Sequence, residues 1–157
     1  MCGIAGFFNY KTKHPASKED LIGVLGSIRY RGPDHLGIYA DGDIAIGNVR
    51  LAIQDISAEG NQPIYNEDGS VVVVYNGEIY NSPELRDSLK AKGHSFRTRT
   101  DTEILVHLYE EYGYDMANDL NGMFAFALFD IKKKLLVLGR DRSAQKPLYF
   151  YLVAPNH

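Results

Sequence analysis

Cys2 is the single cysteine of this 157-residue chain, and it directly follows Met1. On its own, a lone cysteine is most simply a small buried hydrophobic residue. Cysteine is also small enough for the initiator methionine to be trimmed, which would leave a thiol and a free α-amine on one residue. An α-amine has a pKa of about 7.7–8.0 and a thiol about 8.5, so proton transfer between them is nearly balanced at neutral pH. Position 2 therefore favours a nucleophile whose own amine is the general base, a base that retention of Met1 would remove.

The segment Val73 to Glu78, with the sequence VVYNGE, has two interpretations. Asn-Gly between apolar runs is a strong signal for a hairpin turn, and spacing alone favours that turn. The flanking residues, however, do not alternate cleanly between apolar and polar. An Asn76 amide beside the Gly77 N–H would also supply two fixed donors for one developing negative charge, which is what an oxyanion hole requires.

Other charged residues have structural and functional interpretations side by side. Arg50 is either a solvated arginine at a strand edge or a bidentate fork for a substrate carboxylate. Asp101 is either the N-cap of the next helix or the acceptor of a substrate ammonium group. The segment Arg140-Asp141-Arg142 is interpreted as a mutually paired strand end, with a partly buried set as the alternative. The five histidines show no metal-ligand spacing, so we expect no metal site.

Short apolar strands and amphipathic helices must position these residues. Strands are predicted over residues 2–9, 37–40, 44–53, 71–75, 122–130, 135–139 and 148–153. Helices are predicted to begin at Ser17, at Asn81 and at Asp101 or Thr102, and to end near residues 30, 92 and 112. Because most consecutive strands have short connections, antiparallel sheets with helices on their outer faces are favoured. The fold class is α+β.

Composition limits the compartment and the partners. With 17 Lys and Arg against 20 Asp and Glu, the net charge is −3, which gives no electrostatic case for nucleic acid or an anionic membrane. The longest apolar run, Met123 to Phe129, is far shorter than the ~20 residues of a membrane span. One cysteine cannot form an internal disulfide, which suits a reducing compartment. We therefore expect one cytoplasmic domain, residues 1–157, without nucleic-acid or membrane partners.

Several blocks of sequence, in order, resemble a known family. Residues 1–6 (MCGIAG) resemble the start of the class II glutamine amidotransferases, which are N-terminal nucleophile hydrolases. Further blocks resemble the glutaminase domain of glutamine-hydrolysing asparagine synthetases: 31–34 (RGPD), 50–53 (RLAI), 76–81 (NGEIYN), 101–103 (DTE), 121–127 (NGMFAFA) and 139–142 (GRDR). RGPD and NGEIYN favour this branch over the amidotransferases of purine and hexosamine synthesis.

The resemblance implies a four-layer αββα sandwich of two antiparallel sheets, and it implies the chemistry. Cys2 would attack the side-chain carboxamide of L-glutamine, with its own amine as base. The Asn76 side chain and the Gly77 N–H would form the oxyanion hole. Acylation would release ammonia, and water would then release glutamate from the thioester.

The same resemblance implies how glutamine is held. Arg50 would bind its α-carboxylate, and Asp101 and Glu78 would meet its α-ammonium group. The backbone of a short segment would line the pocket: Leu51, Ala52, Ile53 and Gln54. No cofactor or metal is expected in this chain.

The sequence departs from the family pattern in two places. Where the family continues from Arg-Asp-Arg into Phe-Gly and then Ile or Val, this chain has Ser143, Ala144 and Gln145. None of these is a proposed catalytic position, so hydrolysis is expected to survive, and the change bears on local packing and on docking or ammonia transfer there. The second departure is that residues 1–157 contain no counterpart of the family's synthetase half with its ATP pyrophosphatase loop.

ATP and magnesium are therefore expected only on a synthetase domain or subunit outside this chain. That partner would accept the ammonia, with aspartate as the acceptor that the block pattern suggests. The alternative function is a non-catalytic interaction or regulatory module that keeps the amidotransferase fold.

Overall fold

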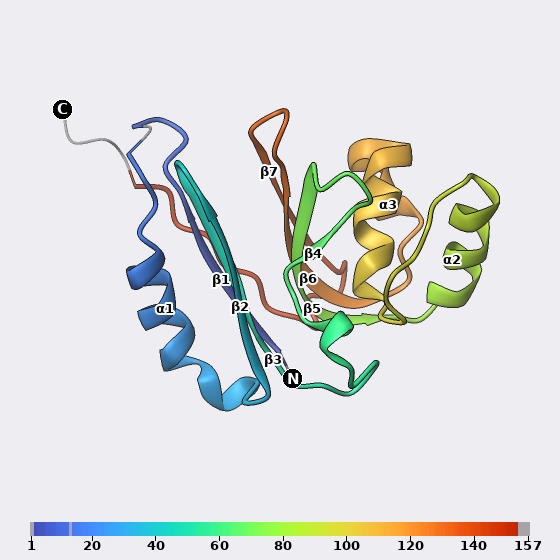
Figure 1. Ribbon diagram of the computed structural model, residues 1–157, viewed down its shortest axis with the longest axis horizontal. Helices are drawn as coiled ribbons and strands as arrows, with labels where there is room; N and C mark the ends of the chain where they lie inside the picture. The colour runs from blue at the N-terminus through green and yellow to red at the C-terminus, as the bar shows by residue number, and fades with distance from the viewer. Residues whose placement is uncertain (1, 13, 154–157) are drawn as a thin grey trace.

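Two antiparallel sheets form the centre of the computed structural model, which describes residues 2–12 and 14–153 (Figure 1). The first sheet has the order β1-β3-β2, with β1 at Gly3–Phe8, β2 at His35–Asp41 and β3 at Ile44–Arg50. The second has the order β4-β5-β6-β7, with β4 at Ile64–Tyr65, β5 at Val71–Ile79, β6 at Gly122–Asp130 and β7 at Leu135–Arg140. Helix α1 (Lys18–Ser27) covers the first sheet, helix α3 (Thr102–Tyr112) covers the second, and helix α2 (Ser82–Ala91) packs beside α3. The predicted α+β sandwich of four layers is confirmed.

Strand β5 explains how the layers are joined. Successive side chains of a strand point to opposite faces, so Val72 and Val74 enter the core between the two sheets. Val71, Val73 and Tyr75 enter the core beneath the helices. The run of valines is therefore the signature of a central strand that is buried on both faces.

Three predicted strands differ from the structure: β5 extends to Ile79, β3 ends at Arg50 and not at Ile53, and the strand predicted over residues 148–153 is wrong. β5 continues through Asn76 and Gly77, which pair with Ala125 and Phe124 of β6, so these residues are not a hairpin turn. The neighbouring nine-residue β6 supplies ladder partners along the whole length of β5, which overrides the local turn signal. No strand forms over residues 148–153 in the described part of the chain, where Tyr149 to Val153 are 66–89% exposed.

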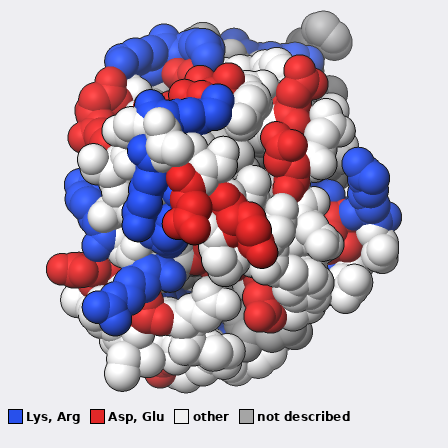
Figure 2. All heavy atoms as spheres, turned by 90° about the vertical axis from the view of Figure 1, so that its right-hand side faces the viewer, with Lys and Arg blue, Asp and Glu red and all other residues white. Residues whose placement is uncertain are grey.

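The surface over α2 and α3 carries acidic and basic side chains interspersed (Figure 2). That pattern agrees with the small net charge of −3. Within residues 2–12 and 14–153, no helix combines the length and the apolar character needed to cross a membrane.

Candidate active site

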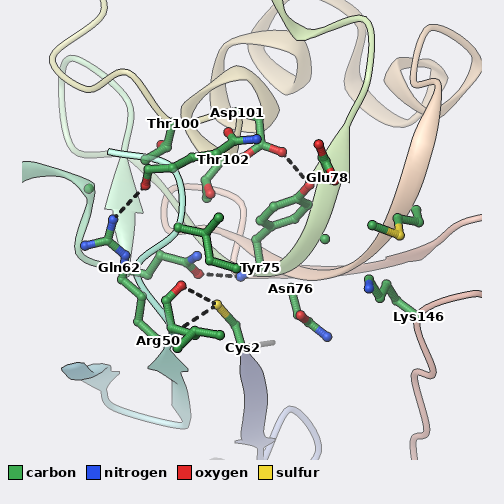
Figure 3. A pocket seen from close by; sticks show the side chains of 16 residues that line it. Cys2, Arg50, Gln62, Tyr75, Asn76, Glu78, Thr100, Asp101, Thr102 and Lys146 are labelled. Carbon is green, nitrogen blue, oxygen red and sulfur yellow. Dashed lines mark hydrogen bonds between the residues drawn. The ribbon is translucent and has the colours of Figure 1, made fainter. Parts of the chain in front are cut away.

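Cys2 immediately precedes β1, at the end of the first sheet where β3 finishes. The Leu51 N–H donates to Cys2 Sγ at 3.5 Å, and the thiol faces the Leu51 carbonyl oxygen at 3.8 Å (Figure 3). Arg31 Nε donates to the Cys2 carbonyl oxygen at 3.1 Å. Cys2 is half-buried in a cavity wall and is not enclosed in the core.

The loop over residues 31–34 fixes the end of β3 beside this thiol. Asp34 donates its N–H to the Arg50 carbonyl oxygen at 3.0 Å and accepts the Ala52 N–H on Oδ2 at 2.8 Å. Gly32 is required because a Cβ there would lie 2.5 Å from the Val49 carbonyl carbon. Residues 31–34 (RGPD) therefore hold in place the backbone segment at the end of β3 that contacts Cys2.

A cavity of about 170 Å³ opens beside Cys2 (Figure 3). Its size is below the ~300–1,000 Å³ of drug-sized pockets, so it suits a small metabolite. The predicted site residues that line it are Cys2, Arg50, Leu51, Ile53, Gln54, Asn76, Gly77, Glu78 and Asp101. Ala52 is not brought into this wall, because its N–H is turned to Asp34.

Asn76 and Gly77 reach the cavity from β5. The Asn76 side chain projects opposite to Tyr75, on the side where Cys2 lies (Figure 3). It is 6% exposed. Gly77 packs tightly on β6, where a Cβ would lie 2.7 Å from the Phe124 Cα. Two potential donors thus stand in the wall that carries the thiol.

Asp101 is the N-cap residue of α3, as predicted, but its side chain makes no capping hydrogen bond. Its Oδ2 accepts the Tyr75 hydroxyl and the Ile79 N–H, each at 2.8 Å. Burial raises the pKa of Asp101, the two hydrogen bonds oppose this, and the nearby Glu78 charge adds to the rise. The carboxylate therefore ties the start of α3 to β5 and stands in the cavity wall.

Arg50 is 4% exposed, so it is not a solvated edge arginine. Nη1 donates to Ser57 O at 3.1 Å and to Asn61 Oδ1 at 2.7 Å. Nη2 donates to Gln54 O at 3.1 Å and to Asp55 O. These four acceptors match the four Nη hydrogens. In this conformation the guanidinium shapes the loop over residues 54–61, and bidentate binding of a substrate carboxylate requires that loop to release it.

The family of the chain follows from its sequence profile. Residues 1–156 match the glutamine amidotransferase domain. The chain belongs to this family. The predicted resemblance is thereby confirmed, and the cavity beside Cys2 is the candidate active site of an amidotransferase domain.

Similar proteins place this amidotransferase domain within longer chains. Asparagine synthetase [glutamine-hydrolyzing] 2 of Oryza sativa subsp. japonica is 44% identical over 149 residues, covering 95% of this chain and 25% of the relative. Asparagine synthetase [glutamine-hydrolyzing] 3 of Bacillus subtilis (strain 168) is 39% identical over 153 residues, covering 96% and 25% respectively. The chain thus spans about a quarter of the length of these relatives.

A solved structure supports the fold of the amidotransferase domain. Glutamine phosphoribosylpyrophosphate amidotransferase from B. subtilis, complexed with ADP and GMP, superposes with a TM-score of 0.68 at 22% identity. The match covers 83% of this chain and 35% of that one. At this identity the likeness concerns the fold alone.

Sequence reasoning missed several residues of the cavity wall: Gly60, Gln62, Tyr75, Thr100, Thr102, Met123 and Lys146. Gln62 is 5% exposed, and its Oε1 accepts the Tyr75 N–H at 2.6 Å. Gln62 and Thr100 come from loops that carry no local signal of a site. Lys146 is 6% exposed and directly follows Ser143, Ala144 and Gln145, the segment that departs from the family pattern.

Asp141 supports the wall from behind, and it does not form the predicted pairs with Arg140 and Arg142. It is 4% exposed. It accepts the backbone N–H groups of Phe124 at 3.2 Å, Gln145 at 2.9 Å and Lys146 at 3.0 Å. Burial raises the pKa of Asp141, but the backbone N–H donors outweigh burial and lower it. The turn wrapped around this carboxylate brings Lys146 to the cavity.

Proposed function

We propose that this domain hydrolyses L-glutamine to glutamate and ammonia, with Cys2 as the nucleophile. The observation that carries the proposal is the convergence of Cys2, Asn76 and Asp101 on one small cavity. The proposal is further supported by the 39–44% identity to proteins named as glutamine-hydrolysing asparagine synthetases.

In the proposed first step, the Cys2 α-amine takes the thiol proton and Sγ attacks the carboxamide carbon of glutamine. This step needs the removal of Met1, which lies outside the described residues. The Leu51 N–H donates to Sγ at 3.5 Å and holds the sulfur in the cavity wall. The oxyanion of the tetrahedral intermediate accepts hydrogen bonds from the Asn76 amide and the Gly77 N–H.

In the second step, the C–N bond breaks and the protonated amine gives its proton to the leaving nitrogen, so ammonia departs and a thioester remains. Water then attacks the thioester with the amine as base. The C–S bond breaks, glutamate leaves, and the thiol regains its proton. Because one amine serves as base and acid in turn, no further titratable group is needed at the reacting atoms.

The ends of glutamine define the remaining roles. Asp101, with Glu78 beside it, receives the α-ammonium group. Its charged form is disfavoured by burial, and a bound cation compensates that cost. Arg50 receives the α-carboxylate when oxygen atoms of the loop over residues 54–61 no longer accept hydrogen bonds from Nη1 and Nη2, which leaves both nitrogens free to bind it. Leu51, Ile53 and Gln54 line the space between.

We further propose that the ammonia passes to a synthetase domain or subunit, with aspartate as its acceptor and with ATP and magnesium bound there. The names of the relatives and the quarter of their length that this chain spans support this proposal. The single cysteine supports a cytoplasmic location, as argued from the sequence.

The test measures glutamate and ammonia released from glutamine by the purified protein. Cys2→Ala is expected to lower kcat by at least ~10³-fold, because nucleophile and covalent intermediate are both lost. His14→Ala, in an exposed loop away from the cavity, is the control and should keep full activity. Mass spectrometry of the N-terminus checks the removal of Met1. Activity that persists in Cys2→Ala contradicts the assignment, and a retained Met1 without hydrolysis favours the non-catalytic module.

A further inference from the structure

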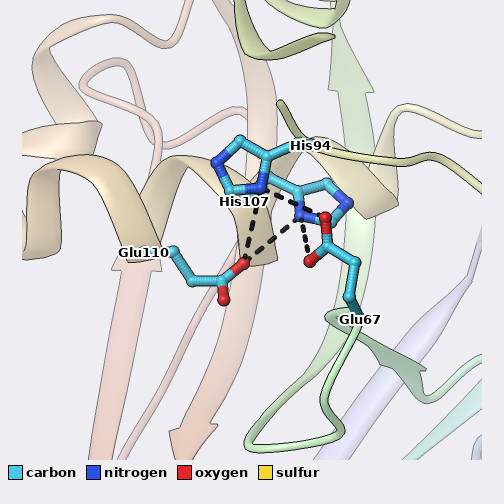
Figure 4. Close-up of side chains that lie close together, drawn as sticks. All are labelled: Glu67, His94, His107 and Glu110. Atoms are coloured by element: carbon cyan, nitrogen blue, oxygen red, sulfur yellow. Dashed lines mark hydrogen bonds and ion pairs between the residues drawn. The ribbon is translucent and has the colours of Figure 1, made fainter. Parts of the chain in front are cut away.

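A second polar cluster lies outside the cavity wall and consists of Glu67, His94, His107 and Glu110 (Figure 4). Glu67 comes from the turn between β4 and β5, His94 from the loop after α2, and the other two from α3. One ligand atom from each residue lies within 4.8 Å of all the others. Only the fold brings the four together, and for this reason their sequence spacing led us to expect no metal site.

The separations suit a tetrahedral ion. His107 Nδ1 lies 3.2 Å from Glu67 Oε2 and 3.3 Å from Glu110 Oε2. His94 Nδ1 lies 3.2 Å from Glu67 Oε1 and 3.8 Å from Glu110 Oε2. A tetrahedral Zn²⁺ with nitrogen and oxygen ligands at ~2.0–2.2 Å has ligand–ligand edges of about 3.3–3.6 Å. The four histidine–glutamate separations lie close to these edges, with the two histidines facing different oxygens of Glu67, and one ligand atom from each residue lies within 4.8 Å of the others.

Both histidines turn the same nitrogen, Nδ1, toward the centre and the other toward a carboxylate. His94 Nε2 lies 3.2 Å from Glu111 Oε1. His107 Nε2 is buried, has no hydrogen-bond partner among the described residues, and faces Glu103 Oε1 at 3.9 Å. A metal-bound histidine usually directs its second N–H to a carboxylate, which fixes the tautomer.

The two carboxylates of the cluster are also oriented from behind. Glu67 Oε1 accepts the Ser95 N–H at 3.0 Å. Glu110 Oε1 accepts Asn66 Nδ2 at 2.7 Å. Each of the four side chains therefore has an outer partner that holds or faces it.

Charge favours a dication at this point. Carboxylates surround the two imidazoles, namely Glu67, Glu103, Glu110 and Glu111, while Lys92 pairs with Glu111 at 2.7 Å. Protonating both imidazoles would place two positive rings with centroids 4.7 Å apart. A divalent ion balances the carboxylates and leaves both imidazoles neutral, as metal ligation requires.

We propose that Glu67, His94, His107 and Glu110 bind one divalent transition-metal ion of the zinc class. Two imidazoles and two carboxylates suit such an ion, whereas magnesium and calcium prefer oxygen ligands alone. Glu67 and Glu110 are 38% and 30% exposed, which provides an entry path. With four protein ligands the site is structural, and it ties the β4–β5 turn and the loop after α2 to α3.

The test titrates the metal-stripped, purified chain with Zn²⁺ in a calorimeter, and Co²⁺ absorption reports the coordination geometry. One Zn²⁺ per chain is expected, together with a rise in melting temperature that Mg²⁺ does not give. Glu67→Gln and His94→Ala change partly accessible ligands and are expected to weaken binding at least 100-fold. Glu111→Gln, which removes only the outer carboxylate behind His94, is expected to weaken it about tenfold.

Matched controls separate this site from other zinc ligands. His14→Ala removes an exposed histidine elsewhere, and Cys2→Ser removes the single thiol, so both should bind Zn²⁺ as the unmodified chain does. Circular dichroism establishes that each variant is folded. The proposal is overturned if the folded chain binds no Zn²⁺, or if binding survives in both His94→Ala and Glu67→Gln. Loss of binding in Cys2→Ser, or displacement of Zn²⁺ by excess Mg²⁺, overturns it as well.

Discussion

Asp101 and Asp141 are both nearly fully buried carboxylates near the same cavity, yet their pKa values are shifted in opposite directions. Burial raises the pKa of Asp101, and the hydrogen bonds from Ile79 and Tyr75 do not cancel that rise. Burial acts on Asp141 too, but backbone N–H donors, including those of Lys146 and Gln145, outweigh it and lower the pKa. Asp141 accepts three backbone N–H groups, whereas Asp101 accepts one backbone N–H and one hydroxyl, both on Oδ2.

The opposite pKa shifts indicate different roles for the two side chains. A carboxylate surrounded by backbone donors is fully used by the fold, and Asp141 holds the turn that carries Lys146. Both side-chain bonds of Asp101 converge on Oδ2, and its charge is not fully compensated by the protein. Asp101 is therefore suited to take a cationic group of a ligand, and Asp141 is suited to stabilise the fold.

The largest expected effect is on stability. Asp141→Asn should lower the free energy of unfolding by about 2–3 kcal/mol, because an Asn amide would present a donor to backbone N–H groups that are already donors. Asp101→Asn should cost less than about 1 kcal/mol, since the Asn Oδ1 can still accept both bonds. Urea unfolding followed by circular dichroism measures both. Equal losses in the two variants would remove the distinction between them.

Activity should respond in the reverse order. Asp101→Asn is expected to raise the KM for glutamine by about 10–100-fold, with a smaller change in kcat, because a charge-assisted bond to the α-ammonium group is worth ~1.5–3 kcal/mol. Steady-state hydrolysis of glutamine measures it. The control is Asp115→Asn, an exposed carboxylate after α3, which should leave KM unchanged. An unchanged KM in Asp101→Asn would show that the ammonium group is held elsewhere.

Some parts of this comparison could be predicted from the sequence and others could not. The difference depends on how far apart in the sequence the interacting residues lie. Cys2, Asn76, Gly77 and Asp101 sit in contiguous motifs, so their convergence on one cavity could be expected from the resemblance. Local signals failed where distant strands decide the conformation. The Asn76-Gly77 turn signal is overridden by pairing with β6.

The remaining features depend on contacts that no local pattern encodes. Asp101 has the sequence context of a helix cap, but Tyr75 and Ile79 of β5 take up its Oδ2. The predicted ion pairs of Asp141 with Arg140 and Arg142 do not form, because the Asp141 carboxylate accepts backbone N–H groups of the following turn and of β6. The cluster of Glu67, His94, His107 and Glu110 joins three separate segments, so it becomes visible only in the folded chain.

The two carboxylates should also differ in how pH changes stability. The folded-state pKa of Asp141 is lowered, so its contribution is present above its unfolded pKa of about 3.9 and is lost as the pH falls through the folded value. The folded-state pKa of Asp101 is raised, so its contribution is present below the unfolded pKa and is lost as the pH rises through the folded value.

Unfolding free energies between about pH 6 and pH 3 test these signs. The stability gap between the unmodified chain and Asp141→Asn should narrow as the pH falls. Over the same range the unmodified chain should gain stability relative to Asp101→Asn. Parallel pH profiles for the two variants would contradict the opposite shifts.

The smallest expected effect concerns the turn that builds the Asp141 site. Ala144 has a φ of +55°, in the left-handed region, and donates its N–H to the Asp141 carbonyl oxygen at 3.0 Å. The resembled family has glycine at this position. A residue with a Cβ pays ~1–2 kcal/mol there, whereas glycine adds some entropy to the unfolded chain. Ala144→Gly should therefore stabilise the fold by about 0.5–1 kcal/mol.

The matched control for Ala144→Gly is Ala91→Gly at the end of α2, where the backbone is helical and the same change should destabilise by up to ~1 kcal/mol. Thermal unfolding of the two variants should thus give shifts of opposite sign. A loss of stability in Ala144→Gly would mean that the turn is unstrained with alanine. Because the turn supports Asp141 and not Asp101, relieving the backbone strain at residue 144 should leave the KM for glutamine unchanged.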